Sequence, residues 1–531
     1  MKTPISAKCL MYAGLIMATS SAWAVTSPIP GSAVQLFKIE PTPERQVLQR
    51  TGTAYMQQLL ADPANEQVTL IELTPTLLTN QTQALAVTLP DGKAAQFHLR
   101  DFTPIAQGIH GWVGYKPSTW KQAHAPSSAT EIDYDPLYYL SLVREGDKLV
   151  GSVIVEGQRY RIDHIGDGQH VLIKVDESKL PKEAEPLKAQ DVAMDNTIGK
   201  APQSAHSIIR VMFLATNQRK AASPNYKLEL ANALNTANQY LKNSKVDLTY
   251  ELAGFYEGAY DEAGRTYQQQ LNDLRLAEPF AGEVLARREL LGADLVSMYS
   301  TVSAVCGVAW LSASKVQGHS VISCPGSLAH ELGHNLGVNH GWKEGDSISN
   351  PPYMHGYRSE GSPAFHTQMI TSHGAIPYFS NPRLTYQGAA LGTVDHHDAA
   401  RRINERRETV ENYYPPVMIN VTVFDNPGMQ GDSCSFDLPA GNMTTTLIED
   451  VCGSAWVRKV WSARVKNMTA GKTLRLGNSV AYHSYTSTSY AGDFDVPTLS
   501  AHALEMPEGM VLTPNNGNLT KLIEQVEIRP L

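Results

Sequence analysis

The stretch HELGHNLGVNH, residues 330–340, contains the residue types of a metal-dependent hydrolytic site. On a helix, His330 and His334 lie one turn apart and project from the same face. Two neutral imidazoles at this spacing can bind one zinc ion, and Glu331 between them can take a proton from the attacking water. Gly337 can end the helix in the left-handed conformation, so that the chain turns back and His340 supplies a third nitrogen. Three protein ligands leave one coordination position open, which distinguishes a catalytic zinc from a structural one.

The helix that carries these residues needs a core on its other side. Leu328, Leu332 and Leu336 recur every four residues and form an apolar stripe opposite the histidines. Ser327 precedes the helix and is expected to cap its N-terminus. A lone His-Glu-x-x-His also occurs in ordinary amphipathic helices, but the added glycine and third histidine favour a metal site.

The complete motif resembles the long zinc signature of the metzincin metalloendopeptidases. This family has a methionine turn beneath the metal, and FHTQMITSHGAIPYFSNP resembles that turn and the pocket wall of bacterial reprolysin-like enzymes, including the peptidyl-Asp metalloendopeptidase type. Met369 is the candidate, because it leads into Ser380, Asn381 and Pro382, whereas the competing Met354 does not. The resemblance implies that Met369 packs under the ligands without binding zinc. Either methionine could also be ordinary core filler.

The segment CGVAWLSAS precedes the zinc helix, and in metzincins the strand at this point forms the sheet edge over the active-site cleft. An unpaired edge can accept an extended peptide as one more strand. The resemblance therefore implies that the substrate backbone binds at Gly307, Val308, Ala309, Trp310 and Leu311. The alternative is a strand without a ligand role.

Composition and the first residues indicate an exported protein of several domains. The chain has 531 residues, of which 42% are hydrophobic and 18% charged, and its net charge of −8 disfavours nucleic acid as a partner. Residues 1–24 are predicted to be a signal peptide, because Lys2 and Lys8 precede an apolar run and Ala22-Trp23-Ala24 offers a cleavage site. That run has about ten apolar residues and a bilayer span needs roughly 20, so we expect a secreted protein without a membrane span.

Four cysteines remain after Cys9 leaves with the signal peptide, and an even number in a secreted chain suggests disulfides. Three pairings are possible. We favour the two that close short local loops within one domain: Cys306–Cys324 and Cys434–Cys452.

Residues 25–200 are predicted to form a pro-region with an antiparallel β-domain, since short β-branched or aromatic runs alternate with Gly, Asp and Pro turns. Part of it resembles the pro-domains of secreted bacterial metalloendopeptidases. Residues 181–207 read as an exposed linker in which an activating cut would fall. No pro-region cysteine is available to block zinc, so latency needs steric cover or an acidic side chain, for which Asp176, Asp191 and Asp195 are candidates.

Residues 201–415 are predicted to form an α/β catalytic domain of the metzincin type, because strand and helix patterns alternate from residue 207 onwards. Residues 416–531 are predicted to form an all-β sandwich, and VTVFDNPGMQGDSCSFDL resembles a βγ-crystallin repeat without a clear calcium pattern. A surface structure or glycan is its candidate ligand. Trp456 and Trp461 are expected to pack in its core rather than form exposed platforms.

The predicted function is a secreted zinc endopeptidase made as a zymogen, with one catalytic Zn²⁺ and proteins or peptides as substrates. An alternative is a surface-binding or adhesin-like protein with an accessory zinc domain, and a third is a zinc hydrolase acting on a non-peptide amide. Arg383 could serve an acidic cleavage preference. The remaining histidines of the central region lack ligand spacing and are expected at the surface: His355, His366, His373, His396 and His397.

Overall fold

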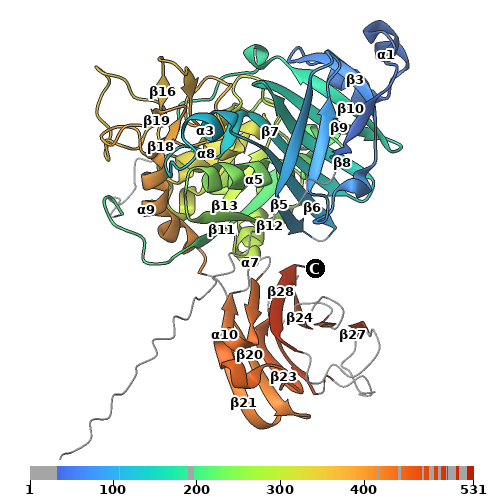
Figure 1. Cartoon of the computed structure of the whole chain (residues 1–531), viewed down its shortest axis with the longest axis vertical. Coiled ribbons are helices and arrows are strands. Elements are labelled where there is room, and N and C mark those ends of the chain that lie inside the picture. Colours follow the sequence, from blue (N-terminus) through green and yellow to red (C-terminus); the bar gives the residue numbers. More distant parts are fainter. Residues whose placement is uncertain are drawn as a thin grey trace, which may run out of the picture.

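The computed structural model describes residues 33–530 except 107, 189–196, 416–417, 440–443, 469–471, 478–483, 488–491, 498, 500–509 and 514–522. The predicted signal peptide and residues Asp191 and Asp195 therefore lie outside the described residues. The chain is multidomain and sheet-rich, and three sheet-containing regions follow one another along it (Figure 1). Within the described ranges, no helix has both the length and the apolar character that a bilayer crossing requires.

The N-terminal region contains one ten-stranded sheet in the order β1-β4-β5-β6-β7-β8-β9-β10-β3-β2. All neighbouring strands are antiparallel except the β1–β4 pair. The predicted strands, from QALAVTLP at residues 83–90 to HVLIKVD at residues 170–176, correspond to β4 to β10. The strand bounds are β1 Val34–Gln35, β2 Phe37–Ile39, β3 Asn65–Leu73, β4 Ala84–Thr88, β5 Ala94–Ala106, β6 Ile109–Pro117, β7 Tyr134–Glu145, β8 Lys148–Val155, β9 Gln158–Gly166 and β10 Gln169–Val175.

The central region contains a five-stranded sheet in the order β12-β11-β13-β15-β14, parallel except for the antiparallel edge strand β14. Side chains of β11 alternate between two cores, as expected for a strand covered on both faces. Ile209 and Phe213 pack with helices α5, α8 and α9, whereas Met212 packs with α6 and α7. The bounds are β11 Ser207–Ala215, α5 Tyr226–Asn243, β12 Leu248–Tyr256, α6 Tyr267–Leu276, α7 Glu283–Leu291, β13 Leu295–Tyr299, β14 Gly307–Ala309, β15 His319–Ile322, α8 Leu328–Asn335 and α9 Ala399–Glu411.

The N-terminal sheet lies against helix α5 of the central region, as Figure 1 shows where the blue and teal strands meet the green helices. Val143 of β7 and Val150 of β8 belong to the same core as Leu234 of α5. Polar pairs cross this contact as well, because the Ser141 hydroxyl donates to the Asn232 side chain at 2.8 Å. The two regions are therefore packed together rather than merely connected.

The C-terminal region contains two antiparallel sheets, of four and five strands, with one shared core. Val421, Val465 and Ile528 are fully buried between them. Trp456 packs against this core, although it lies in a short 3-10 helix, Ser454–Trp456, where the run WVRKVWSARV predicts a strand. The strand bounds are β20 Met418–Asn426, β21 Gln430–Pro439, β22 Thr444–Leu447, β23 Ser462–Met468, β24 Lys472–Gly477, β25 Ser484–Ser487, β26 Gly492–Val496, β27 Met510–Thr513 and β28 Gln525–Pro530.

Candidate metal centre

Helix α8 positions the first two histidines. Leu328, Leu332 and Leu336 are fully buried, so the predicted apolar stripe anchors the helix in the central core. The helix ends at Asn335, and Gly337 two residues later has a left-handed φ of 84°. Two bonds close this end: the Gly337 N–H donates to the His334 carbonyl at 2.8 Å, and the Val338 N–H donates to the Gly333 carbonyl at 3.0 Å. This two-bond end turns the chain back toward the helix.

The predicted cap at Ser327 is wrong. Ser327 is the last residue of a 3-10 turn, Pro325–Ser327, and its side chain makes no capping bond to the helix. Its hydroxyl instead donates to the Glu183 carboxylate at 2.5 Å. The Ser327 side chain, which was expected to cap the helix, therefore binds a residue 144 positions earlier in the chain.

The three motif histidines converge on one point. Nε2 of His340 lies 3.0 Å from Nε2 of His330 and 3.1 Å from Nε2 of His334. Among the described residues, this is the group of three or more potential ligands whose donor atoms all lie within 4.8 Å of one another. The sequence motif thus becomes a compact set of nitrogen donors.

Hydrogen bonds at the far side of two rings favour a cation at this point. Nδ1–H of His334 donates to the Val338 carbonyl at 2.7 Å, and Nδ1–H of His340 donates to the Glu185 carboxylate at 3.2 Å. Each ring then has an unprotonated Nε2, so two lone pairs face each other. A metal ion relieves that repulsion, and partners of this kind are usual behind zinc-binding histidines. The residues present therefore fit zinc.

Burial keeps these rings in the form that binds metal. Desolvation lowers the pKa of His330 and His334 well below the ordinary value, and it lowers that of His340 too. A buried imidazole loses the hydration that stabilises its charged form, so it stays neutral. Neutral histidine is the state that metal coordination requires.

Glu331 lies beside the histidines and is fully buried. Both of its carboxylate oxygens lack a hydrogen-bond partner among the described residues. Burial raises its pKa well above the ordinary value, and the neighbouring charge of Glu183 raises it further. Its carboxylate packs on Gly307, where an added Cβ would lie 2.7 Å from the Glu331 Cδ atom. The predicted base is thus held between a glycine of the edge strand and a carboxylate from outside the motif.

Met369 lies under helix α8, fully buried and with a φ of 75°. An added Cβ on Gly333 would lie 2.7 Å from the Met369 sulfur, so the helix and the methionine touch through a glycine. Met354 is elsewhere, where its carbonyl accepts the Asn339 N–H at 2.7 Å. Met369 therefore contacts the helix that carries His330 and His334, at Gly333.

The edge strand β14 does not have a free outer side. It pairs with β15 on one side, and residues 182–187 pair with the other side in parallel. The Cys306 N–H donates to the Lys182 carbonyl at 3.0 Å, the Ala184 N–H to that of Gly307 at 3.1 Å, and the Leu187 N–H to that of Ala309 at 2.9 Å. The strand itself ends at Ala309, but the pairing continues because the Leu311 N–H donates to the Leu187 carbonyl at 2.9 Å.

Several histidines expected at the surface are instead buried. His355, His366 and His397 are at most 8% exposed. Their ring nitrogens bind backbone carbonyls of nearby loops: His355 bonds to the His340 carbonyl at 2.6 Å and His397 to that of Trp342 at 2.9 Å. A buried backbone carbonyl needs a hydrogen-bond donor, and in these loops the buried imidazoles supply it. None of the three joins the ligand group.

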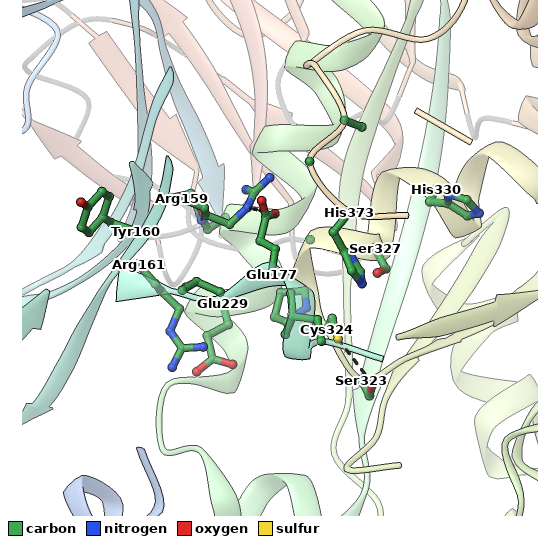
Figure 2. Close-up of a pocket in the computed structure, with 18 of the residues that line it drawn as sticks. Arg159, Tyr160, Arg161, Glu177, Glu229, Ser323, Cys324, Ser327, His330 and His373 are labelled. Carbon is green, nitrogen blue, oxygen red and sulfur yellow. Dashed lines mark hydrogen bonds and ion pairs between the residues drawn. The ribbon is translucent and has the colours of Figure 1, made fainter. Parts of the chain in front are cut away.

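A cavity of about 250 Å³ lies between the start of helix α8 and the N-terminal sheet. Figure 2 shows His330 and Ser327 on the helix side and Arg159 and Arg161 on the sheet side. The proposed specificity residue Arg383 does not line it. The Arg383 guanidinium instead donates two hydrogen bonds to the Asp398 carboxylate, at 2.6 and 2.7 Å.

Both predicted disulfides are present. Cys306 is bonded to Cys324 and Cys434 to Cys452, with Cα–Cα distances of 4.9 and 5.9 Å. The first bond ties the residue before β14 to the residue before the 3-10 turn that leads into α8. It therefore links the edge strand to the metal-binding helix.

Comparisons with known proteins agree with this site. Residues 228–341, from α5 to just beyond His340, match metallopeptidase family M12B, reprolysin-like. The chain is 29% identical over 339 residues to a peptidyl-Asp metalloendopeptidase of Stenotrophomonas maltophilia (strain K279a), covering 60% of this chain and 80% of the relative. It is 27% identical over 368 residues to a protein of the same name from Xanthomonas campestris pv. campestris, covering 66% and 87%. A protein of that name from S. maltophilia strain R551-3 is 27% identical over 402 residues, covering 72% and 89%.

Proposed function

We propose that this chain, which matches the reprolysin-like M12B metallopeptidase family over residues 228–341, is a zinc metalloendopeptidase that is exported, is made as a zymogen and uses Glu331 as its general base. The observation that carries this proposal is the convergence of three imidazole nitrogens beside a buried carboxylate. A site with three nitrogen ligands and an adjacent base is suited to hydrolysis rather than to structural metal binding.

In the proposed mechanism, Nε2 of His330, His334 and His340 would hold the metal, which when bound would supply polarisation of the scissile carbonyl and acidification of water. Glu331 takes a proton from the attacking water and later delivers a proton to the leaving amine. The Val338 carbonyl fixes the orientation of the His334 ring through its Nδ1–H. Met369 packs under helix α8 and supports the positions of the ligands without binding the metal.

The direct test replaces Glu331 by Gln in the enzyme activated by a cut in the linker. The amide keeps the shape of the side chain but cannot accept the proton, so peptide cleavage should fall by about 100- to 10,000-fold. Zinc content, measured by atomic absorption, and the unfolding temperature should stay unchanged. The matched control is Glu344→Gln, which alters an exposed glutamate of the loop after the motif and should keep full activity. A fully active Glu331→Gln protein would refute the assignment.

The names of the relatives support a proposal about substrates. We infer that this chain cleaves proteins or peptides next to acidic residues, as peptidyl-Asp metalloendopeptidase names indicate for the relatives. A peptide library digested with and without a chelator, then read by mass spectrometry, tests both specificity and metal dependence. Cleavage that ignores acidic residues would contradict this inference, and cleavage that survives chelation would contradict the metal mechanism.

The zymogen proposal is supported by the packing of the N-terminal region on the central region. Residues 182–187 cover the outer side of β14, and the N-terminal sheet closes the cavity beside His330. An extended substrate needs that edge, so access requires this segment to leave. We propose that a cut in the linker, residues 181–207, permits this release. A surface or glycan ligand of the C-terminal sandwich stays a prediction.

A further inference from the structure

Residues 182–187 of the linker, called the covering segment below, run along the site as an extended strand. As in any extended strand, alternate side chains point to opposite sides. Ala184 faces the core formed by Val308 and Val321, whereas Glu183 and Glu185 face the other way. Glu185 meets the His340 ring and Glu183 meets the start of helix α8. The covering segment thus presents two carboxylates to the site.

Glu183 makes a specific set of contacts. One carboxylate oxygen accepts the Ser327 hydroxyl at 2.5 Å. The other is buried without a hydrogen-bond partner among the described residues, and so are both oxygens of the adjacent Glu331. Glu183 is not in the group of potential ligands that includes the three histidines. Its carboxyl group lies close enough to that of Glu331 for the two to interact directly, whereas it does not join the ligand nitrogens.

We propose that the covering segment is a built-in inhibitor that takes the place of a substrate along β14, and that Glu183 blocks the site by covering the Glu331 carboxylate rather than by binding the metal. This inference rests on the proposed function. Four backbone bonds between residues 182–187 and residues 306–311 hold the covering segment on the edge. The Ser327 bond then fixes the Glu183 side chain beside the proposed base.

This assignment replaces the candidates expected from sequence. Asp176 accepts bonds from the Ser178 backbone and hydroxyl, at 3.1 and 2.6 Å, within its own turn and does not reach the site. Asp191 and Asp195 lie outside the described residues. Glu183 was missed because its contact with Ser327 joins positions 144 residues apart, which no local pattern reveals.

The test compares Glu183→Ala with Lys182→Ala in the full-length, zinc-loaded chain, with mass spectrometry confirming that it is uncleaved. Lys182 is exposed and contributes its backbone carbonyl to the pairing, so its side chain is a matched control. We expect Glu183→Ala to hydrolyse a short quenched fluorescent peptide at least tenfold faster than the unmodified chain, and Lys182→Ala to stay within twofold. Glu183→Gln should stay latent, because its amide can keep the Ser327 contact and still cover Glu331.

Two further measurements separate this inference from the proposed function. Hydrogen exchange at the Cys306 and Leu311 amides reports whether the covering segment is seated, independently of activity, and should accelerate in Glu183→Ala alone. The visible spectrum of the cobalt-substituted chain should be the same in the unmodified and Glu183→Ala proteins, since Glu183 is not a ligand. If Glu183→Ala does not fold, Glu183→Ser has the same expected results.

The inference is overturned if Glu183→Ala matches the unmodified chain in rate and exchange, or if Glu183→Gln is as active as Glu183→Ala. A changed cobalt spectrum would also overturn it, because Glu183 would then bind the metal. A chain that stays inactive after its N-terminal region is removed would instead contradict the proposed function.

Discussion

The surroundings of Glu331 leave its side chain little room to move. Gly307 lies against the carboxyl group, and Gly333 on the same helix lies against the Met369 sulfur. Each glycine allows a close approach that any larger residue would prevent. The position of the Glu331 carboxyl group, the proposed base, therefore depends on Gly307 having no side chain.

Replacing Gly307 by Ala should push the base out of place. The new Cβ would lie 2.7 Å from the Glu331 Cδ atom, so the carboxyl must shift. We expect kcat/KM of the activated enzyme to fall at least tenfold, or about 1.4 kcal/mol of transition-state stabilisation, while zinc content is retained. Gly326→Ala is the control, because its Cβ would meet nothing within 4 Å. Equal activity of the two variants would show that Gly307 does not position the base.

The elements around the site were predictable to different degrees. The zinc motif depends on helix periodicity and one left-handed glycine, which are local properties, and the pairing of Cys306 with Cys324 follows from a short loop. The buried positions of His355 and His397 depend on carbonyls supplied by distant loops, so spacing alone gave the wrong answer. The place of β3 between β2 and β10 is equally non-local, because β3 pairs with a strand about 100 residues later.

The two disulfides allow a matched comparison between elements. Each joins cysteines 18 residues apart, so chain entropy alone assigns both the same stabilisation of about 3 kcal/mol. Replacing Cys306 and Cys324 by Ser should lower both the stability of the central region and its proteolytic activity, since this bond links β14 to the helix entry. Replacing Cys434 and Cys452 should destabilise the C-terminal sheets and leave activity unchanged.

Urea unfolding and peptide cleavage, measured on both double variants, check this prediction. If loss of the Cys434–Cys452 bond reduced the specific activity of the folded protein as much as loss of the other bond, the C-terminal region would have to act on the site. Activity that survives loss of Cys306–Cys324 would show that pairing with β15 alone positions the edge strand.

At the scale of the whole molecule, the contact between the N-terminal sheet and α5 is rich in polar groups. Asn225, at the start of α5, donates to the Asp163 carboxylate at 2.7 Å and to the His164 carbonyl at 2.6 Å. Tyr55 donates to the other Asp163 oxygen at 2.6 Å. Burial raises the pKa of Asp163 to about 6. A contact held by directed bonds is specific, and its affinity depends on each buried partner.

Replacing Asn225 by Ala should weaken this contact. Asp163 would keep its burial but lose a donor, which costs about 1–3 kcal/mol. After the linker is cut, we expect the N-terminal region to bind the rest of the chain at least fivefold more weakly, as measured by calorimetry. Asn272→Ala is the control, since that amide donates to Gln268 in its own helix. Unchanged affinity in Asn225→Ala would mean that the apolar part of the contact is sufficient.

The covering segment and the site beneath it belong to one polypeptide. An attached ligand meets its site at an effective concentration in the millimolar range, which does not depend on how many copies of the protein a cell contains. Once the link is cut, the same contacts must form between two separate molecules. The fraction of enzyme that is covered then depends on the concentration of the two molecules. With the proposed export and linker cleavage, dilution outside the cell would favour the free enzyme, so a single break in the backbone and a change of compartment together would switch proteolysis on.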